Sequence, residues 1–164
     1  MPLTREVLEK YKSEAFIETG LGDGGGVCVA DAVGFNPIYS IELDFDQVSK
    51  AGRLPFSAHV LTGDSAKMLR MLLGSQWGFR TTFWLDAHPC INPMRLDQCP
   101  LLAELDAIGG CDMPAPFILI DDMRVFSAPD RMRIEESLRA VMWIKNVVYE
   151  DSPCGRGDIM VGTP

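Results

Sequence analysis

The sequence predicts an α/β fold, in which a doubly wound and mostly parallel sheet has helices on both faces. Short apolar segments alternate with amphipathic helical segments five times along the chain, which is the pattern of repeated βαβ units. Each of these apolar segments runs into an acidic residue at or just beyond its end, and a glycine-rich loop follows the first. The last two apolar segments flank the turn Ser152–Gly157, which predicts a closing antiparallel hairpin.

The boundaries of the elements follow from capping and turn residues. Buried parallel strands read as short apolar runs, and the predicted strands are Ala15–Glu18, Ile38–Glu42, His59–Thr62, Thr81–Asp86 and Phe117–Ile120, with Val147–Glu150 and Asp158–Val161 as the hairpin. Helices are expected over Thr4–Tyr11, after the glycine loop as far as Gly34, around Asp46–Gly52, after Ser65 as far as Gly74, from Pro100 to Gly109, and around Ile134–Val141. We expect Thr4 and Ser65 to be N-terminal caps.

The length of 164 residues and the composition are those of one globular domain. Hydrophobic residues make up 47% and charged residues 23% of the chain. We expect a single domain over 1–164, with a short helix over 4–12 before a core over 14–163. The five cysteines form no CxxC pair, the apolar runs are too short to cross a bilayer, and the first residues lack the order of a signal peptide. These features predict a cytoplasmic protein with no membrane partner.

The net charge of −8 argues against nucleic acid as a partner. Proteins that bind nucleic acid cluster their lysines and arginines against the phosphates. The arginines of this chain are instead scattered along it, for example Arg53, Arg70, Arg80, Arg95 and Arg124.

The glycine loop that follows the first strand can approach a ligand closely. It reads Glu18-Thr19-Gly20-Leu21-Gly22-Asp23-Gly24-Gly25-Gly26. The spacing fits G-x-G-x-x-G, which binds dinucleotides. It also resembles the acid-x-G-x-G-x-G loop of class I S-adenosylmethionine-dependent methyltransferases. A tight turn without a ligand is the third interpretation. The loop alone leaves the three open.

Acidic residues after the second and third strands could complete a nucleoside site. Glu42 ends the second strand, where a carboxylate can accept hydrogen bonds from both ribose hydroxyls. Asp44 is the alternative, although it could equally cap the next helix. Asp64 follows the third strand, where an acid can bind the adenine amino group. For Asp64 and Ser65 the alternative is a plain helix cap.

The ends of the fourth and fifth strands bring three carboxylates toward one crevice. Asp86 follows the fourth strand, and Asp121 and Asp122 follow the fifth. Converging carboxylates repel one another unless a proton or a cation neutralises them, and oxygen ligands favour Mg²⁺ or Ca²⁺. His88 follows Asp86 by two residues, and histidine is the side chain best suited to act as a general base near neutral pH. The alternative interpretation is that Asp121 or Asp122 caps a turn and that His88 is an ordinary loop histidine with no catalytic role.

The order of these parts resembles the class I S-adenosylmethionine-dependent methyltransferase family over roughly residues 14–163. The resemblance implies the strand order 3-2-1-4-5-7-6, with the seventh strand antiparallel, and S-adenosyl-L-methionine as cofactor. It implies the following cofactor-binding residues: Glu18, Gly20, Gly22, Gly24, Glu42, Asp64, Ser65 and Asp86.

The acids of the fourth and fifth strands are further similar to those of metal-dependent O-methyltransferases of the catechol and sugar or macrolide type. This resemblance implies Mg²⁺ ligands at Asp86, Asp121 and Asp122, with His88 and Asp86 as catalytic residues. His88 would take the proton of a small-molecule or sugar-like hydroxyl before that oxygen attacks the methyl group.

The chain departs from this family in having almost nothing before its first strand. The loop Pro89–Gln98 is the only sizeable segment expected to cover a methyl acceptor. Such an open site suits a large acceptor, a homodimer partner that covers it, or no catalysis. A catalytically degenerate methyltransferase-fold binding module therefore remains an alternative function. An NAD-binding Rossmann domain is another, although it would need a catalytic half that this chain lacks.

Overall fold

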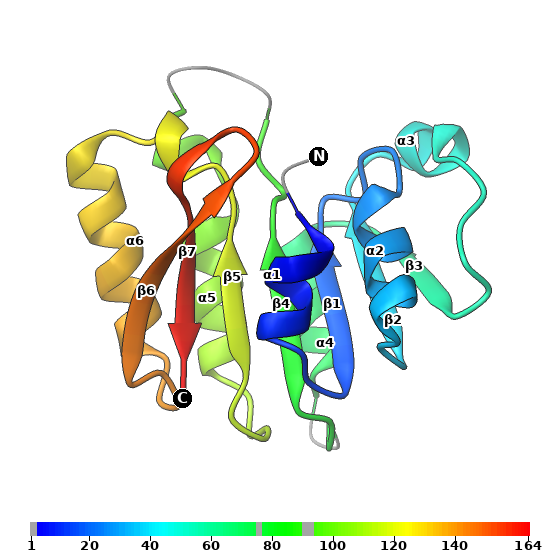
Figure 1. Cartoon of the computed structure of the whole chain (residues 1–164), viewed down its shortest axis with the longest axis horizontal. Coiled ribbons are helices and arrows are strands. Elements are labelled where there is room, and N and C mark those ends of the chain that lie inside the picture. Colours follow the sequence, from blue (N-terminus) through cyan, green and yellow to red (C-terminus); the bar gives the residue numbers. More distant parts are fainter. Residues whose placement is uncertain (1–2, 75–76, 90–93) are drawn as a thin grey trace.

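Seven strands form one sheet in the order β3-β2-β1-β4-β5-β7-β6 (Figure 1). The computed structural model describes residues 3–74, 77–89 and 94–164. The strands are β1 (Ala15–Thr19), β2 (Ile38–Glu42), β3 (Ala58–Thr62), β4 (Thr81–Leu85), β5 (Phe117–Ile120), β6 (Asn146–Ser152) and β7 (Gly155–Thr163). β7 is antiparallel to both of its neighbours, whereas β1 to β5 are parallel. The predicted fold class and strand order are confirmed.

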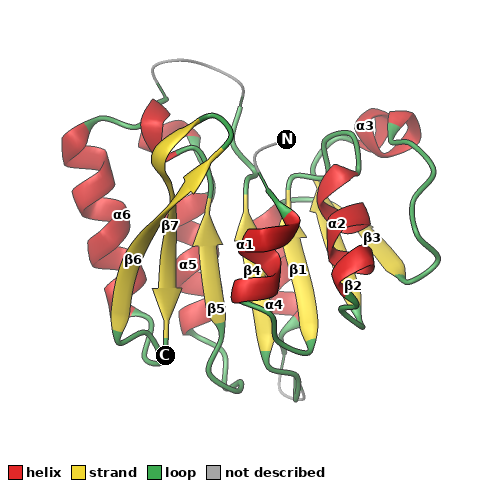
Figure 2. Cartoon of the chain, viewed as in Figure 1, coloured by secondary structure: helices red, strands yellow, loops and turns green. Residues whose placement is uncertain are grey.

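Helices cover both faces of the sheet, as the alternating pattern predicts (Figure 2). They are α1 (Arg5–Lys10), α2 (Gly25–Val33), α3 (Phe45–Lys50), α4 (Ser65–Leu72), α5 (Leu101–Gly109) and α6 (Ala128–Ala140), with two single turns of 3₁₀ helix, η1 (Leu96–Gln98) and η2 (Met123–Val125). Within the described residues no helix is long and apolar enough to cross a membrane.

The core consists of two apolar layers, one on each face, because side chains alternate along each strand. Phe16, Trp84 and Leu119 pack with α1 and α2 on one face. Their chain neighbours point to the other face and pack with α4, α5 and α6. All five residues of β1 and of β4 are buried, as expected of central parallel strands.

The observed helix caps agree only in part with those predicted from the sequence. Thr4 caps α1 and Asp44 caps α3, each through a side-chain oxygen that accepts a backbone N–H. The prediction that Ser65 caps α4 is wrong, because the Asp64 carboxylate accepts the N–H of Lys67 and is the cap. Ser65 is the first helical residue and is buried.

The carboxyl ends of β1 to β5 lie at one edge of the sheet, and the antiparallel β7 begins near that edge. Figure 1 shows the loops after β1, β2 and β4 gathered there. Part of the predicted lid, Pro89–Gln98, lies outside the described residues, which here include Pro89 and residues 94–98.

Candidate active site

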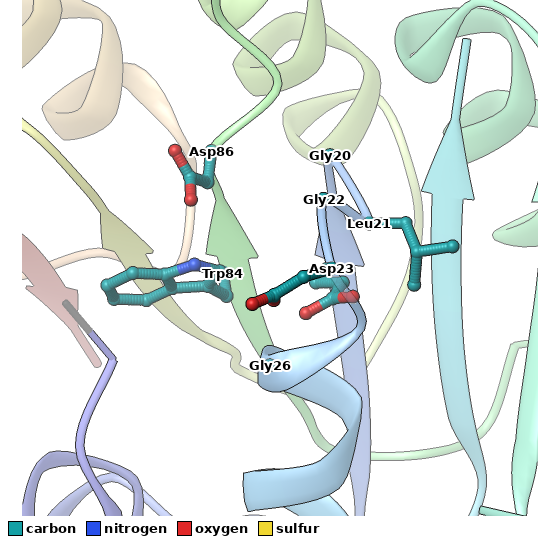
Figure 3. A pocket seen from close by; sticks show the side chains of 8 residues that line it. Gly20, Leu21, Gly22, Asp23, Gly26, Trp84 and Asp86 are labelled. Carbon is teal, nitrogen blue, oxygen red and sulfur yellow. The ribbon is translucent and has the colours of Figure 1, made fainter. Parts of the chain in front are cut away.

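A cavity of about 240 Å³ opens at the ends of β1 and β4 (Figure 3). It is lined by Glu18, Gly20, Leu21, Gly22, Asp23, Gly26, Trp84 and Asp86. Trp84 and Asp86 lie across from the glycine loop. The cavity therefore brings together four of the predicted cofactor residues, Glu18, Gly20, Gly22 and Asp86.

The glycine loop needs glycine at specific positions. Gly20 has φ +85°, and a Cβ atom there would lie 2.7 Å from the carbonyl oxygen of Asp86. Gly24 has φ +82° and precedes the first turn of α2, where a Cβ atom would lie 2.4 Å from the Leu54 side chain. Gly20 thus brings the backbone of the loop against the residue that follows β4, where no side chain larger than hydrogen fits, whereas Gly24 meets only the end of the Leu54 side chain.

Glu18 is buried beneath the first turn of α2. A Cβ atom at Gly26 would lie 1.9 Å from Glu18 Oε2, so the absence of a side chain at Gly26 leaves room for this carboxyl group. Glu18 Oε1 accepts a hydrogen bond from Ser40 Oγ at 2.7 Å. Burial raises the pKa of Glu18 from 4.5 to about 8, and the hydrogen bond offsets part of that rise. A cationic ligand group in the cavity would restore its charge.

Glu42 holds the glycine loop to the end of β2. Glu42 Oε2 accepts the N–H of Leu21 and Oε1 accepts the N–H of Asp44, both at 3.0 Å. Each carboxylate oxygen has a second lone pair that can accept from a ligand hydroxyl. Asp44 uses its own carboxylate to cap α3, which was the alternative interpretation of that residue.

The predicted residues after β3 lie apart from this cavity. Asp64 is exposed and binds the backbone of Lys67, and Ser65 is buried at the start of α4. Neither lines the cavity, and neither do Gly24 and Glu42. A role for Asp64 and Ser65 in binding the adenine group remains a prediction.

His88 lies between two carboxylates at the ends of β4 and β5. Its Nε2 atom is 3.2 Å from Asp86 Oδ1 and 3.4 Å from Asp122 Oδ2. The side chain is only 8% exposed, and neither ring nitrogen has a hydrogen-bond partner among the described residues. Asp86, His88 and Asp122 (the His88 set) offer one donor atom each within 4.8 Å of one another. Asp86 also lines the cavity, so it joins the two parts of the site.

Burial and mutual repulsion raise the pKa of the acids in this crevice. The pKa of Asp86 rises from 3.8 to about 7 through burial and the charge of Asp122, and a side-chain interaction with Trp84 offsets part of the rise. The pKa of Asp121 rises from 3.8 to about 8 through burial and the charges of Asp86 and Asp122. A bound cation would remove this penalty.

A second group of acids shares Asp122. Asp121, Asp122 and Asp158 (the Arg124 set) also offer donor atoms within 4.8 Å of one another. Asp158 comes from β7 and is fully buried, and Arg124 forms ion pairs with both Asp122 and Asp158. Asp121, a predicted ligand, thus groups with Asp158 rather than with Asp86.

Several residues in and near the candidate site had no role predicted from the sequence. Asp158 and Arg124 belong to no recognised motif. Trp84 lies in a strand that was predicted only to be buried, and it is buried but also forms a wall of the cavity. Glu104 on α5 is 1% exposed, and its Oε1 atom has no hydrogen-bond partner among the described residues. The apolar run Leu101–Ile108 contains both Glu104 and the exposed Asp106, so the sequence alone does not indicate which of the two is buried.

Solved structures of other proteins share the fold of this chain. No family model matches the sequence, and no curated protein does either. Human methyltransferase-like protein 13, solved with S-adenosylhomocysteine, has a TM-score of 0.70 at 15% identity, over 98% of this chain and 75% of that one. The O-methyltransferase TomG from Streptomyces achromogenes, solved with S-adenosylmethionine, has a TM-score of 0.70 at 12% identity, over 97% and 76%.

A further structure, of a protein named CmcI with magnesium and S-adenosylmethionine, has a TM-score of 0.60 at 15% identity, over 98% of this chain and 69% of that one. At these identities the likeness concerns the fold. The chain has the fold of S-adenosylmethionine-dependent methyltransferases, and O-methyltransferases are among its structural neighbours.

Proposed function

We propose that this protein is an S-adenosylmethionine-dependent methyltransferase that transfers a methyl group to a hydroxyl of a small-molecule or sugar-like acceptor, with the help of a divalent cation. The observation that carries the proposal is the cavity between the glycine loop and β4. It lies at the carboxyl edge of the sheet, where open α/β sheets bind their ligands. Structural neighbours of the same fold were solved with S-adenosylmethionine or S-adenosylhomocysteine.

The residues of the cavity fit such a cofactor. The glycine loop allows close approach, and the buried Glu18 carboxyl group would gain from a positively charged amino group. Glu42 does not line the cavity, but it accepts the N–H of Leu21, which does, and it has acceptor capacity for ribose hydroxyls. The bound cofactor would supply the electrophilic methyl group.

The acids of the crevice fit a divalent cation, because they combine oxygen donors with buried atoms that lack partners. Asp86 and Asp122 would hold it, and the ion would lower the pKa of an acceptor hydroxyl. The third predicted ligand, Asp121, groups with Asp158 in the Arg124 set instead. His88 would take the hydroxyl proton, since its ring lies beside the two carboxylates that would hold the ion.

The cofactor part of the proposal is tested by titrating the full chain with S-adenosylhomocysteine in a calorimeter. We expect saturable binding, and the absence of heat at high micromolar concentration would overturn the cofactor assignment. A parallel titration with NADH covers the dinucleotide alternative. Binding of NADH in place of S-adenosylhomocysteine would favour that function instead.

The roles of His88 and Asp86 are separated by measuring Mn²⁺ binding beside methyl transfer. We expect Asp86→Asn to lose both, and His88→Gln to lose methyl transfer while it still binds Mn²⁺. Loss of Mn²⁺ by His88→Gln would make the histidine a ligand rather than the base. A wild-type chain that binds S-adenosylhomocysteine but transfers no methyl group to any hydroxyl acceptor tried would favour a binding module.

A further inference from the structure

Asp122 is shared by two groups of charged side chains that face opposite ways. Its Oδ2 atom faces His88 in the His88 set, at 3.4 Å. Its Oδ1 atom pairs with the guanidinium of Arg124 in the Arg124 set. The two oxygens of one carboxylate therefore belong to two different sites.

The Arg124 set has the donors of a cation site of its own. Asp121, Asp122 and Asp158 supply only oxygen donors, which a hard divalent ion prefers. Asp121 is 1% exposed, and its Oδ2 atom has no hydrogen-bond partner among the described residues. A buried carboxylate oxygen without a partner is costly unless a cation neutralises it.

Arg124 already supplies a positive charge there. Its Nη1 atom forms ion pairs with Asp122 Oδ1 and Asp158 Oδ2, and its backbone N–H donates to Asp158 Oδ1 at 3.2 Å. Asp158 is fixed in turn by Ser152, whose Oγ donates to Oδ2 at 2.5 Å. If the guanidinium left, the buried Asp158 carboxylate would keep these two neutral donors but lose its ion-pair partner, which is costly for a buried charge.

We infer that Arg124 is the built-in cation of the Arg124 set and confines a divalent ion to the side of Asp122 that faces His88 and Asp86. The inference rests on the proposed function for the ion itself and adds a role for Arg124. An ion in the Arg124 set would lie beside the guanidinium and be repelled by it. Without Arg124, the shared carboxylate of Asp122 could bridge two ions, as carboxylates do in two-metal sites.

The backbone conformation at Asp122 supports the inference that Arg124 occupies one side of its carboxylate and the ion the other. Asp122 has φ +58°, and it alone among the described residues other than glycine has a positive φ. Such a conformation is unfavourable and persists where surrounding contacts enforce it. Here it begins η2 and brings Arg124, two residues later, against the same carboxylate that faces His88.

The test counts the Mn²⁺ ions that the full chain binds, by calorimetry and by electron paramagnetic resonance of free Mn²⁺. We expect the wild type to bind a single ion and Arg124→Gln to bind a second. The double variant Arg124→Gln/Asp158→Asn should return to a single ion, because the new site loses a ligand. Arg95→Gln is the matched control, since it removes an exposed arginine whose one ion-pair partner among the described residues is Asp97.

Each outcome bears on the inference. Wild-type stoichiometry in Arg124→Gln would overturn it, as would a second ion in Arg95→Gln, which would reflect general charge alone. If the wild type binds no Mn²⁺, the metal part of the proposed function fails, and a first ion gained by Arg124→Gln would still support the role of Arg124. No ion in either protein would overturn both.

A second variant serves if circular dichroism shows that Arg124→Gln does not fold. Arg124→Lys keeps the positive charge and should bind only the ion of the wild type. A second ion in Arg124→Lys would overturn the inference.

Discussion

Two glutamates are buried on opposite faces of the sheet with no cationic partner among the described residues. Glu18 and Glu104 are each 1% exposed, and burial raises their pKa values from 4.5 to about 8 and about 7. In the folded chain each keeps its proton to higher pH than in the unfolded chain. The unfolded state therefore loses protons first as the pH rises above 4.5, and the free energy of unfolding falls until the folded-state pKa is passed.

Glu104 allows a direct test of this pH dependence. We expect Glu104→Gln to remove the part of the fall between pH 4.5 and 7 that this residue causes, because the amide carries no charge at any of these pH values. The gain relative to wild type at pH 8 should approach about 3 kcal/mol. Urea unfolding at pH 5 and pH 8 measures it.

The exposed Glu136 provides the control for that experiment. Glu136→Gln should follow the wild-type pH dependence. Parallel curves for wild type and Glu104→Gln across the whole range would contradict the assignment of the effect to Glu104.

Glu42 and Asp44 lie two residues apart and differ in their expected roles. Glu42→Gln should weaken the binding of S-adenosylhomocysteine by about 10- to 100-fold, because a charged acceptor for the ribose is lost. Asp44→Asn should bind nearly as the wild type does, since asparagine also caps helices well. Calorimetric titration of both variants compares them, and the reverse order of affinities would move the ribose contact to Asp44.

The site residues that could be predicted from the sequence are those that directly follow a predicted strand. Asp86, Asp122 and His88 come together because the ends of neighbouring parallel strands meet at one edge, which the sequence indicates. The cap of α4 was assigned wrongly to Ser65, because Asp64 and Ser65 are both good caps and only the backbone decides between them. Glu104 depends on tertiary packing and could not be placed from its neighbours in the chain.

The first two glycines of the glycine loop, Gly20 and Gly22, have different surroundings. Gly20 and Gly22 both have positive φ, but a Cβ atom at Gly20 would meet the backbone of Asp86, whereas one at Gly22 has nothing within 4 Å. The loop is therefore tightly packed at its first glycine and open at its second. Of the two, only Gly20 contacts the backbone that follows β4.

Substitution of these two glycines separates backbone strain from the close contact. Gly22→Ala should lower stability by about 1–2 kcal/mol, the cost of a left-handed conformation. Gly20→Ala should cost more, and it should also weaken S-adenosylhomocysteine binding at least several-fold, because the loop must move away from β4. Thermal unfolding and calorimetry test both effects, and equal losses in the two variants would argue against the contact with Asp86.

The closing hairpin was predicted as an element, but its contribution to the site was not. β7 is antiparallel, so its beginning rather than its end carries Asp158 to the edge where the other acids lie. A register shift between Glu150 and Ser152 further changes which side chains face that edge. A slip of one residue in a strand reverses the direction of every side chain, and the sequence does not fix the shift.

The β3 edge of the sheet is less buried than its centre. β1 and β4 are buried throughout, whereas every residue of β3 is at least partly exposed and α3 buries no side chain. Elements with few buried apolar contacts open at lower free energy than the core does. The part of the chain that carries Glu42 and Asp64 should thus be the more easily opened part.

Hydrogen exchange tests this difference across the whole molecule. We expect the amides of β3 and α3 to exchange faster than those of β1 and β4, and added S-adenosylhomocysteine to slow the exchange near β2 and β3. Uniform protection in the free protein would contradict the unequal stability. A ligand effect confined to β5 and β7 would contradict a cofactor site at the glycine loop.

The architecture as a whole was the most predictable level. The alternation of apolar and helical segments determines the layers, and the resemblance to a family supplied the strand order that the sheet has. The lid and the acceptor pocket were not predictable in this way, because they depend on loops whose conformation short-range patterns do not determine.

Trp84 gives the cavity an optical reporter of its own. It is one of three tryptophans in the chain, is 2% exposed, and lines the wall beside Asp86. A molecule that enters the cavity displaces water next to the indole ring and changes the surroundings of its excited state. With Trp77 and Trp143, both only partly buried, replaced by phenylalanine, the remaining emission would report the occupancy of this cavity without any added label.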